Sequence, residues 1–153
     1  MSDTTPGWIA PAALVTAVVA VVLAVWGLLR SPADDDPSAE QTAEAKTQVC
    51  DAFDMVRNAV SLQTNADLGK DKVATQAVAA NARLATLGGG QFLLSRLDAA
   101  VPQDLADAVR SFANNLEYIG MGQLAGMAGD DPAQTSRLND AQASATRVGE
   151  LCR

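Results

Sequence analysis

The sequence predicts an all-α protein, with one N-terminal transmembrane helix followed by an up-and-down bundle of about four helices. Residues 8–29 contain no charged side chain. From residue 39 onward, apolar residues recur at spacings of three and four, and no stretch alternates apolar and polar residues as a half-buried strand does. Helix-start signals, such as Ser38 and Asp131, precede several of these apolar stripes.

The predicted membrane anchor follows a short tail, residues 1–7. Residues 8–29 read WIAPAALVTAVVAVVLAVWGLL, and as a helix they would span ~33 Å, against a hydrocarbon core of ~30 Å. Trp8 and Trp26 lie near the two ends, where aromatic rings favour the membrane interface. An uncleaved anchor is favoured over a cleaved signal because the tail has no Lys or Arg, although Ser31-Pro32-Ala33 resembles a cleavage site.

One face of the predicted anchor consists of small residues. Their spacings of four and three would align them as a packing ridge, namely Ala13, Ala17, Ala20, Ala24 and Gly27. Helices associate in lipid by close packing along such residues, so the ridge favours contact with a membrane-protein partner or with a second copy. The alternative is chance, because the whole chain is rich in alanine.

Residues 30–38 form an acidic, proline-containing linker, with Asp34, Asp35 and Asp36 in succession. Three solvated aspartates are the expectation there, in preference to a weak cation site. Ser38 and Gln41 then have the spacing of a capping box, which starts the bundle of residues 39–153.

We expect the first bundle helix over about residues 39–66, with the stripe Val49, Phe53, Val56 and Val60. The second is expected over about 70–87, with one face made of Val73, Ala77, Ala80, Leu84 and Leu87. Gly88-Gly89-Gly90 is then expected to end the helix or form a hinge, and a short apolar helix is expected over 92–97.

Pro102 is expected to begin the next helix, whose stripe is Leu105, Val109, Phe112, Leu116 and Ile119. Asp131 followed by Pro132 predicts the start of the last helix. Its stripe is Leu138, Ala141, Ala145, Val148 and Cys152.

The two cysteines, Cys50 and Cys152, lie near the two ends of the bundle region. A disulfide is favoured over two buried free thiols, and in the chain-entropy model a loop of this size stabilises by ~4.7 kcal/mol. Disulfides persist in oxidising compartments, which favours an extracytoplasmic domain. Arg30 and Lys46 favour the opposite orientation under the positive-inside rule.

Composition argues against several functions. The net charge is −7, and aromatic residues make up 4%, which disfavours nucleic-acid binding. The chain has no histidine, so the commonest acid–base residue and metal ligand is missing. The acid pairs Asp51/Asp54 and Asp104/Asp107 lie off the apolar stripes and are expected to be solvated. We therefore expect no enzyme, no cofactor and no metal site.

A second candidate contact region is Gly122-x-x-x-Gly126, flanked by Met121 and Met127. Flexible thioethers beside glycines adapt to a partner surface. The alternative is a fraying helix end before Asp130.

The anchor, the phrases AVAANARLATLGGGQFL and DLADAVRSFANNL, and the sequence Glu150-Leu151-Cys152 resemble small alanine-rich, single-pass membrane proteins of actinobacteria. The resemblance implies a location in the cell envelope and no particular activity. Two functions remain open. One is a non-enzymatic accessory or interaction subunit of a membrane assembly. The alternative is a ligand-binding or sensory bundle that holds a lipid or another apolar molecule.

Overall fold

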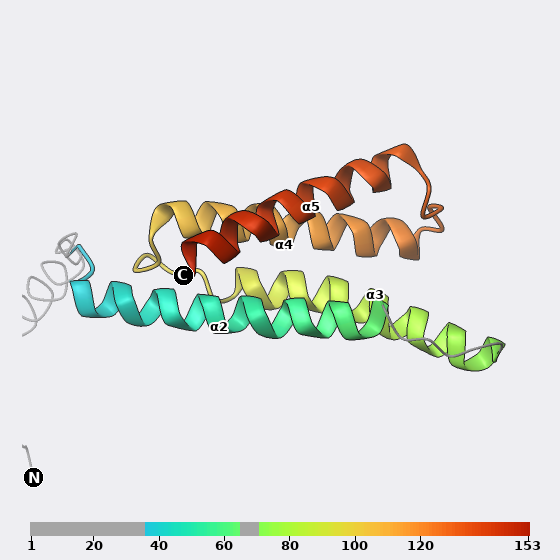
Figure 1. Cartoon of the computed structure of the whole chain (residues 1–153), viewed down its shortest axis with the longest axis horizontal. Helices are drawn as coiled ribbons and strands as arrows, with labels where there is room; N and C mark the ends of the chain where they lie inside the picture. Colours follow the sequence, from blue (N-terminus) through green and yellow to red (C-terminus); the bar gives the residue numbers. More distant parts are fainter. Residues whose placement is uncertain (1–35, 65–70) are drawn as a thin grey trace, which may run out of the picture. The chain divides into compact units, whose positions relative to one another are not determined.

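Four helices make up the part of the chain that this computed structural model describes, residues 36–64 and 71–153 (Figure 1). They are α2 (Ala39–Thr64), α3 (Lys72–Leu94), α4 (Gln103–Leu124) and α5 (Pro132–Leu151). No strand occurs in these residues. The predicted helical bundle is therefore confirmed for this part of the chain.

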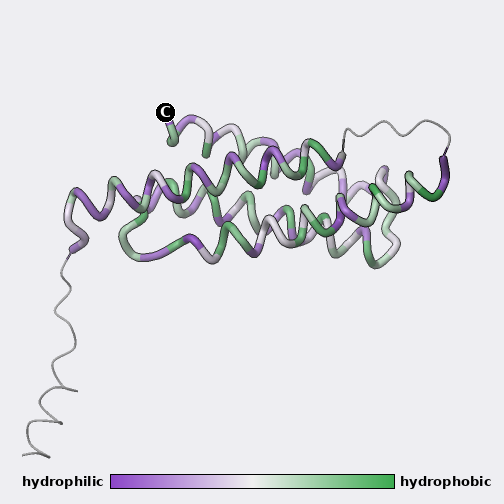
Figure 2. The backbone as a smooth tube through the Cα atoms, turned by 90° about the horizontal axis from the view of Figure 1, so that it is seen from below, coloured by the Kyte–Doolittle hydropathy of each residue, from purple (hydrophilic) through white to green (hydrophobic). Residues whose placement is uncertain are grey.

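The predicted transmembrane helix and its small-residue ridge lie outside the described residues, as do the tail and residues 30–35 of the linker. Among the described helices, none combines the length and the apolar character that a membrane span needs. Figure 2 shows hydrophilic residues interspersed along each of them. The anchor at residues 8–29 remains a prediction.

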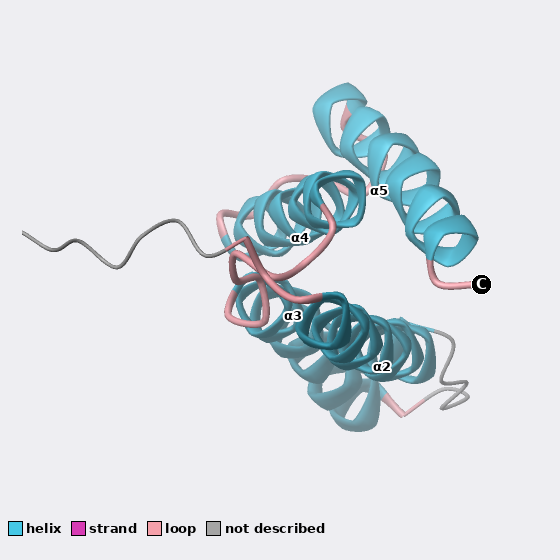
Figure 3. Cartoon of the chain, turned by 90° about the vertical axis from the view of Figure 1, so that its left-hand side faces the viewer, coloured by secondary structure: helices cyan, strands magenta, loops and turns pink. Residues whose placement is uncertain are grey.

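Successive helices run in opposite directions, as in an up-and-down bundle (Figure 1). Viewed end-on, α4 lies between α3 and α5, and α2 lies beside α3 (Figure 3). The neighbours in sequence pack extensively, whereas α2 and α5 have few contacts. The α2–α3, α3–α4 and α4–α5 pairs are thus closely packed, and the α2–α5 pair is loosely packed.

Side-chain caps begin three of the helices. The predicted capping box is present before α2, since the Ser38 backbone N–H donates to Gln41 Oε1 at 2.8 Å and the Gln41 N–H donates to Ser38 Oγ at 3.2 Å. Asp71 caps α3 by accepting from the Val73 and Ala74 N–H groups. Each cap provides an acceptor for helix-terminal donors that have no intrahelical partner.

The cap of α5 provides a first test. Asp131 Oδ1 accepts from the backbone N–H groups of Ala133 at 2.8 Å and Gln134 at 3.4 Å. Asp131→Ala is expected to lower the free energy of unfolding by about 1 kcal/mol, because these donors lose their acceptor. Urea unfolding of the full chain measures the loss. Asp130→Ala, a neighbouring exposed acid, is the matched control and should change stability by less than about 0.5 kcal/mol. Equal effects of the two changes would contradict the cap.

The core follows the predicted stripes of α2 and α4. All five stripe residues of α4 are buried, and Val49, Phe53 and Val56 of α2 are buried with them. The rings of Phe53 and Phe112 meet edge to face, with centroids 5.3 Å apart. Aromatic pairs in this geometry contribute about 0.5–1.5 kcal/mol beyond the area they bury. The contact between these two rings links α2 to α4 across the bundle.

The prediction for the second helix was wrong in two respects. Gly88-Gly89-Gly90 neither ends the helix nor forms a hinge, and the short helix expected over 92–97 does not form separately, because α3 runs unbroken from Lys72 to Leu94. The expected face is also largely exposed, with Val73 at 76% and Leu84 at 70% of their full accessibility. The residues of α3 that are buried are Thr86, Gly90 and Leu93.

Close helix approach explains this difference. A Cβ atom on Gly90 would lie 2.8 Å from the backbone oxygen of Ala113 in α4, and one on Gly89 would lie 2.6 Å from Val56 Cγ1 in α2. The glycines therefore occupy the place where α3 is packed between its two neighbours. The inward face of α3 therefore combines the large apolar side chain of Leu93 with glycines that allow close approach.

Candidate functional site

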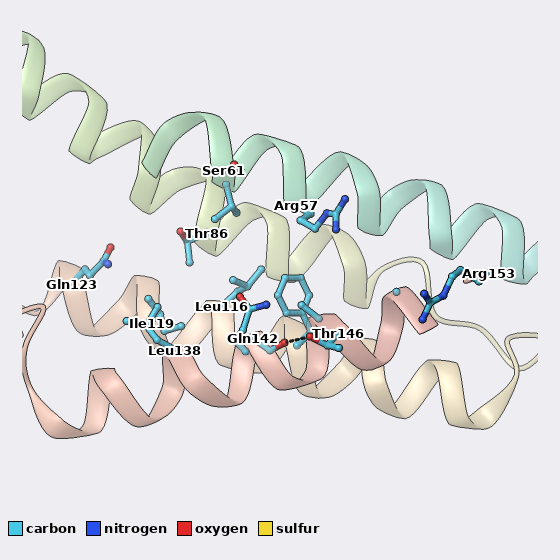
Figure 4. A pocket seen from close by; sticks show the side chains of 15 residues that line it. Arg57, Ser61, Thr86, Leu116, Ile119, Gln123, Leu138, Gln142, Thr146 and Arg153 are labelled. Atoms are coloured by element: carbon cyan, nitrogen blue, oxygen red, sulfur yellow. Dashed lines mark hydrogen bonds between the residues drawn. The ribbon is translucent and has the colours of Figure 1, made fainter. Parts of the chain in front are cut away.

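A cleft of about 600 Å³ lies where α2 and α5 fail to pack closely (Figure 4). Four helices contribute to its walls. Arg57, Val60 and Ser61 come from α2, and Thr86 comes from α3. Residues of α4 and α5 complete the walls, with Arg153 beyond the end of α5. They are Phe112, Leu116, Ile119 and Gln123 of α4 and Leu138, Ala141, Gln142, Ala145, Thr146 and Gly149 of α5. We call this site the α2–α5 cleft.

The attachment of α5 explains why the cleft exists. Two side-chain hydrogen bonds join α5 to α4: Gln134 Nε2 donates to the Ile119 carbonyl at 3.3 Å, and Arg137 Nη1 donates to Asn115 Oδ1 at 3.2 Å. The Arg137 guanidinium also stacks on Tyr118, 4.3 Å from the ring centroid. These contacts hold α5 to the side of α4 and leave the face toward α2 sparsely packed.

A disulfide joins α2 to the end of α5. Cys50 and Cys152 are bonded, with their Cα atoms 5.7 Å apart, which confirms the predicted pairing over two free thiols. The bond closes a sequence separation of 102 residues. It therefore connects α2 and α5 covalently at one end of the cleft, while the rest of the cleft stays open between them.

Apolar side chains line most of the cleft floor. They include Phe112, Leu116, Ile119, Leu138, Ala141 and Ala145. Leu138 is 50% exposed, so its predicted burial in the α5 stripe was wrong. It lies instead in the wall of the cleft, near Ile119 (Figure 4). Small-molecule sites combine such apolar linings with a few polar groups in volumes of about 300–1,000 Å³.

The polar groups of the cleft lie around this apolar floor. Thr86 is buried, and its hydroxyl donates to the Ala82 carbonyl at 2.7 Å. Gln123 and Gln142 add side-chain amides to the lining (Figure 4). Among the described residues that line it, the charged ones are Arg57 and Arg153, and none is Asp or Glu. These residues offer binding contacts, and they include no paired carboxylates and no nucleophile–base pair.

The predicted contact residues near the end of α4 lie in different environments. Met121 and Met127 are exposed, whereas Gly122 is buried and faces the Gln134 side chain of α5. Gly126 lies in the turn after α4 with φ of +83°, a conformation that favours glycine. Gly122 thus makes room for α5, and a partner-contact role for these residues remains a prediction.

The other chemistry-bearing residues are dispersed. Asp51, Asp54, Asp104 and Asp107 are exposed, as their positions off the apolar stripes predict. The described residues contain no group of three or more cysteine or acidic side chains placed to hold a metal ion. Among the described residues, the α2–α5 cleft is therefore the candidate binding site.

The sequence alone did not predict this cleft, which residues of four helices line. The apolar residues of its floor were recognised as stripe residues, although Leu138 is exposed and not buried as predicted. Arg57 and Arg153 were not singled out, because they lie far apart in the chain. Comparison with known proteins finds no family model that matches the chain, no similar curated protein and no similar solved structure.

Proposed function

We propose that this chain is a non-enzymatic binding protein that holds an apolar or amphipathic small molecule in the α2–α5 cleft. The apolar floor of a cleft of about 600 Å³ carries the proposal. Burying a ligand there would shield Leu138 and the other apolar side chains of the wall from water, which favours binding by about 25 cal/mol per Å² of apolar surface.

The charge-free segment at residues 8–29 supports a membrane tether for this domain. The disulfide supports an oxidising, extracytoplasmic location. Together they describe a single-pass envelope protein whose bundle binds molecules at or near the bilayer. Labelling of intact cells with an impermeant thiol reagent, with and without reductant, tests the location. Cysteines that react only after reduction support it, and cysteines that react only after cell lysis contradict it.

A glycine in the wall of the cleft gives a direct test of binding. Gly149 lines the cleft, and a Cβ atom added to it would meet nothing within 4 Å. Gly149→Leu should therefore add a side chain to the wall of the cleft, and its Cβ atom has open space around it. The probe is a long-chain alkyl alcohol or alkyl carboxylate with a diazirine near the end of its chain, and the protein is the full chain in zwitterionic nanodiscs.

We expect photolabelling of α4 and α5 peptides in the original chain and a loss of about tenfold or more in Gly149→Leu, corresponding to about 1.4 kcal/mol. The matched control is Gly88→Leu, because a Cβ atom on this exposed α3 glycine also meets nothing within 4 Å and lies outside the cleft. Labelling that Gly149→Leu leaves unchanged for both probes would refute the proposed function.

A second candidate is the accessory or interaction subunit of a membrane assembly. It is favoured by large apolar side chains exposed toward the end of α4, since clustered exposure of this kind marks interaction surfaces. These residues are Tyr118, Met121, Leu124 and Met127. Co-purification in mild detergent tests it. Recovery of a stoichiometric partner that Met121→Asp releases supports it, whereas recovery of the chain alone contradicts it.

A further inference from the structure

The charge of the cleft is opposite to that of the chain. The chain carries a net charge of −7, yet within the part of the chain that the structure describes, the charged side chains that line the cleft are two arginines, Arg57 and Arg153. In an acidic protein, a cavity wall with this bias would attract an anion into a site that the rest of the surface disfavours. The charge therefore discriminates among the apolar molecules that the cleft could hold.

The two arginines lie toward one end of the cleft. Figure 4 shows Arg57 on α2 and Arg153 beyond α5 on one side, and Ile119, Leu138 and Gln123 on the other. Arg153 directly follows Cys152, whose disulfide to Cys50 anchors this end. Arg153 thus lies at the disulfide end of the cleft, Arg57 lies on α2 seven residues after Cys50, and Ile119 and Leu138 lie farther from the disulfide.

Both arginines have donors to offer a ligand. Asp54 lies 3.9 Å from Arg57, but the two side chains are 62% and 67% exposed, and exposed pairs of this kind contribute little. A guanidinium group has five N–H donors in a planar fork that matches carboxylate and phosphate oxygens. Each arginine therefore adds directional hydrogen bonds as well as charge.

Resting on the function proposed above, we propose that the α2–α5 cleft binds a single-chain anionic amphiphile. The acidic head lies at Arg57 and Arg153, and the alkyl chain lies along Leu116, Ile119 and Leu138. A cleft of about 600 Å³ suits a drug-sized ligand, which one alkyl chain resembles in size and a two-chain phospholipid exceeds. Burial of the alkyl chain on this floor favours binding, and the arginines fix the direction of the chain.

The test compares two photoreactive probes that differ only in the head group, a long-chain alkyl carboxylate and the corresponding alkyl alcohol. Each carries its diazirine near the end of the chain and is added to the full chain in zwitterionic nanodiscs. We expect both to label the cleft, with the carboxylate label centred on peptides that contain Ile119 and Leu138. Arg57→Gln and Arg153→Gln should each weaken carboxylate labelling about fivefold, as one partly exposed ion pair allows, and leave alcohol labelling unchanged.

Arg110→Gln is the matched control, because Arg110 is exposed on α4 and pairs with Asp107 outside the cleft. It should leave labelling by both probes unchanged. Equal labelling by the two probes, with no effect of Arg57→Gln or Arg153→Gln, would overturn the anionic ligand and leave the binding function standing. Failure of Gly149→Leu to reduce labelling by either probe would overturn the binding function itself. The two failures are therefore distinguishable.

Discussion

Replacing Cys50 and Cys152 together by serine is expected to lower the free energy of unfolding by about 2–4 kcal/mol. The bond joins residues 102 positions apart, so its loss restores a large amount of conformational freedom to the unfolded chain. The folded chain also loses its covalent link between α2 and α5, a pair that otherwise has few contacts. Urea unfolding of the full chain in neutral detergent, followed by circular dichroism, measures the difference.

Reduction provides the control for this comparison. The original chain treated with reductant should unfold at the urea concentration of the double variant, and reductant should leave the double variant unchanged. Loss of the bond should also increase amide hydrogen exchange more in the last turns of α5 than in α4, because α4 lies at the centre of the bundle. Unfolding midpoints that agree between the oxidised and reduced chains would rule out this stabilising role.

The second large effect is expected at the contact between α3 and α4. Gly90→Leu should lower the free energy of unfolding by about 2–3 kcal/mol, because overpacking forces the two helices apart. The added Cβ atom alone would lie 2.8 Å from the Ala113 oxygen and 2.7 Å from Glu117 Cγ. A backbone oxygen cannot rotate away as a side-chain end can, so α3 itself must shift.

The same change two residues earlier is the matched control. A Cβ atom on Gly88 meets nothing within 4 Å, so Gly88→Leu adds no clash. It should stabilise the chain by about 0.5–1 kcal/mol, since leucine favours the helix over glycine. Opposite signs for the two variants in the same urea experiment are the expected result. If Gly90→Leu proves as stable as Gly88→Leu, the close packing of α3 and α4 is incorrect.

The helices that the sequence predicted best are those whose cores depend on large side chains. In α4, a bulky residue in every turn from Leu105 to Ile119 marks the buried face, and all five residues are buried. The disulfide was also predictable, because Cys50 lies at the edge of the first helix's stripe and Cys152 lies on the stripe of the last helix. Aspartate at position 131 followed by proline identified the start of α5 in the same way. Each of these features follows from the identity of individual residues: large apolar residues are buried, cysteines form the disulfide, and aspartate before proline begins a helix.

The features that the sequence failed to predict depend on how closely the helices approach one another in three dimensions. The inward face of α3 contains Gly90 where two backbones approach each other, and a hydropathy pattern gives such a residue no weight. Val73 and Leu84 have more apolar surface than Gly90 and nevertheless face solvent. The cleft is a property of how α5 lies against α4 and α2, so no local pattern encodes it. Arg57 and Arg153 gain their possible role only from that arrangement.

The wide separation of the bonded cysteines has a consequence for synthesis on the ribosome. The contacts of each helix are mostly with the next helix in the chain, so α2, α3 and α4 can assemble in the order in which they emerge. The covalent closure, in contrast, must wait until residue 152 has left the exit tunnel. Until then Cys50 is a nascent-chain thiol without its native partner, and its pairing depends on the oxidising machinery that the emerging polypeptide meets.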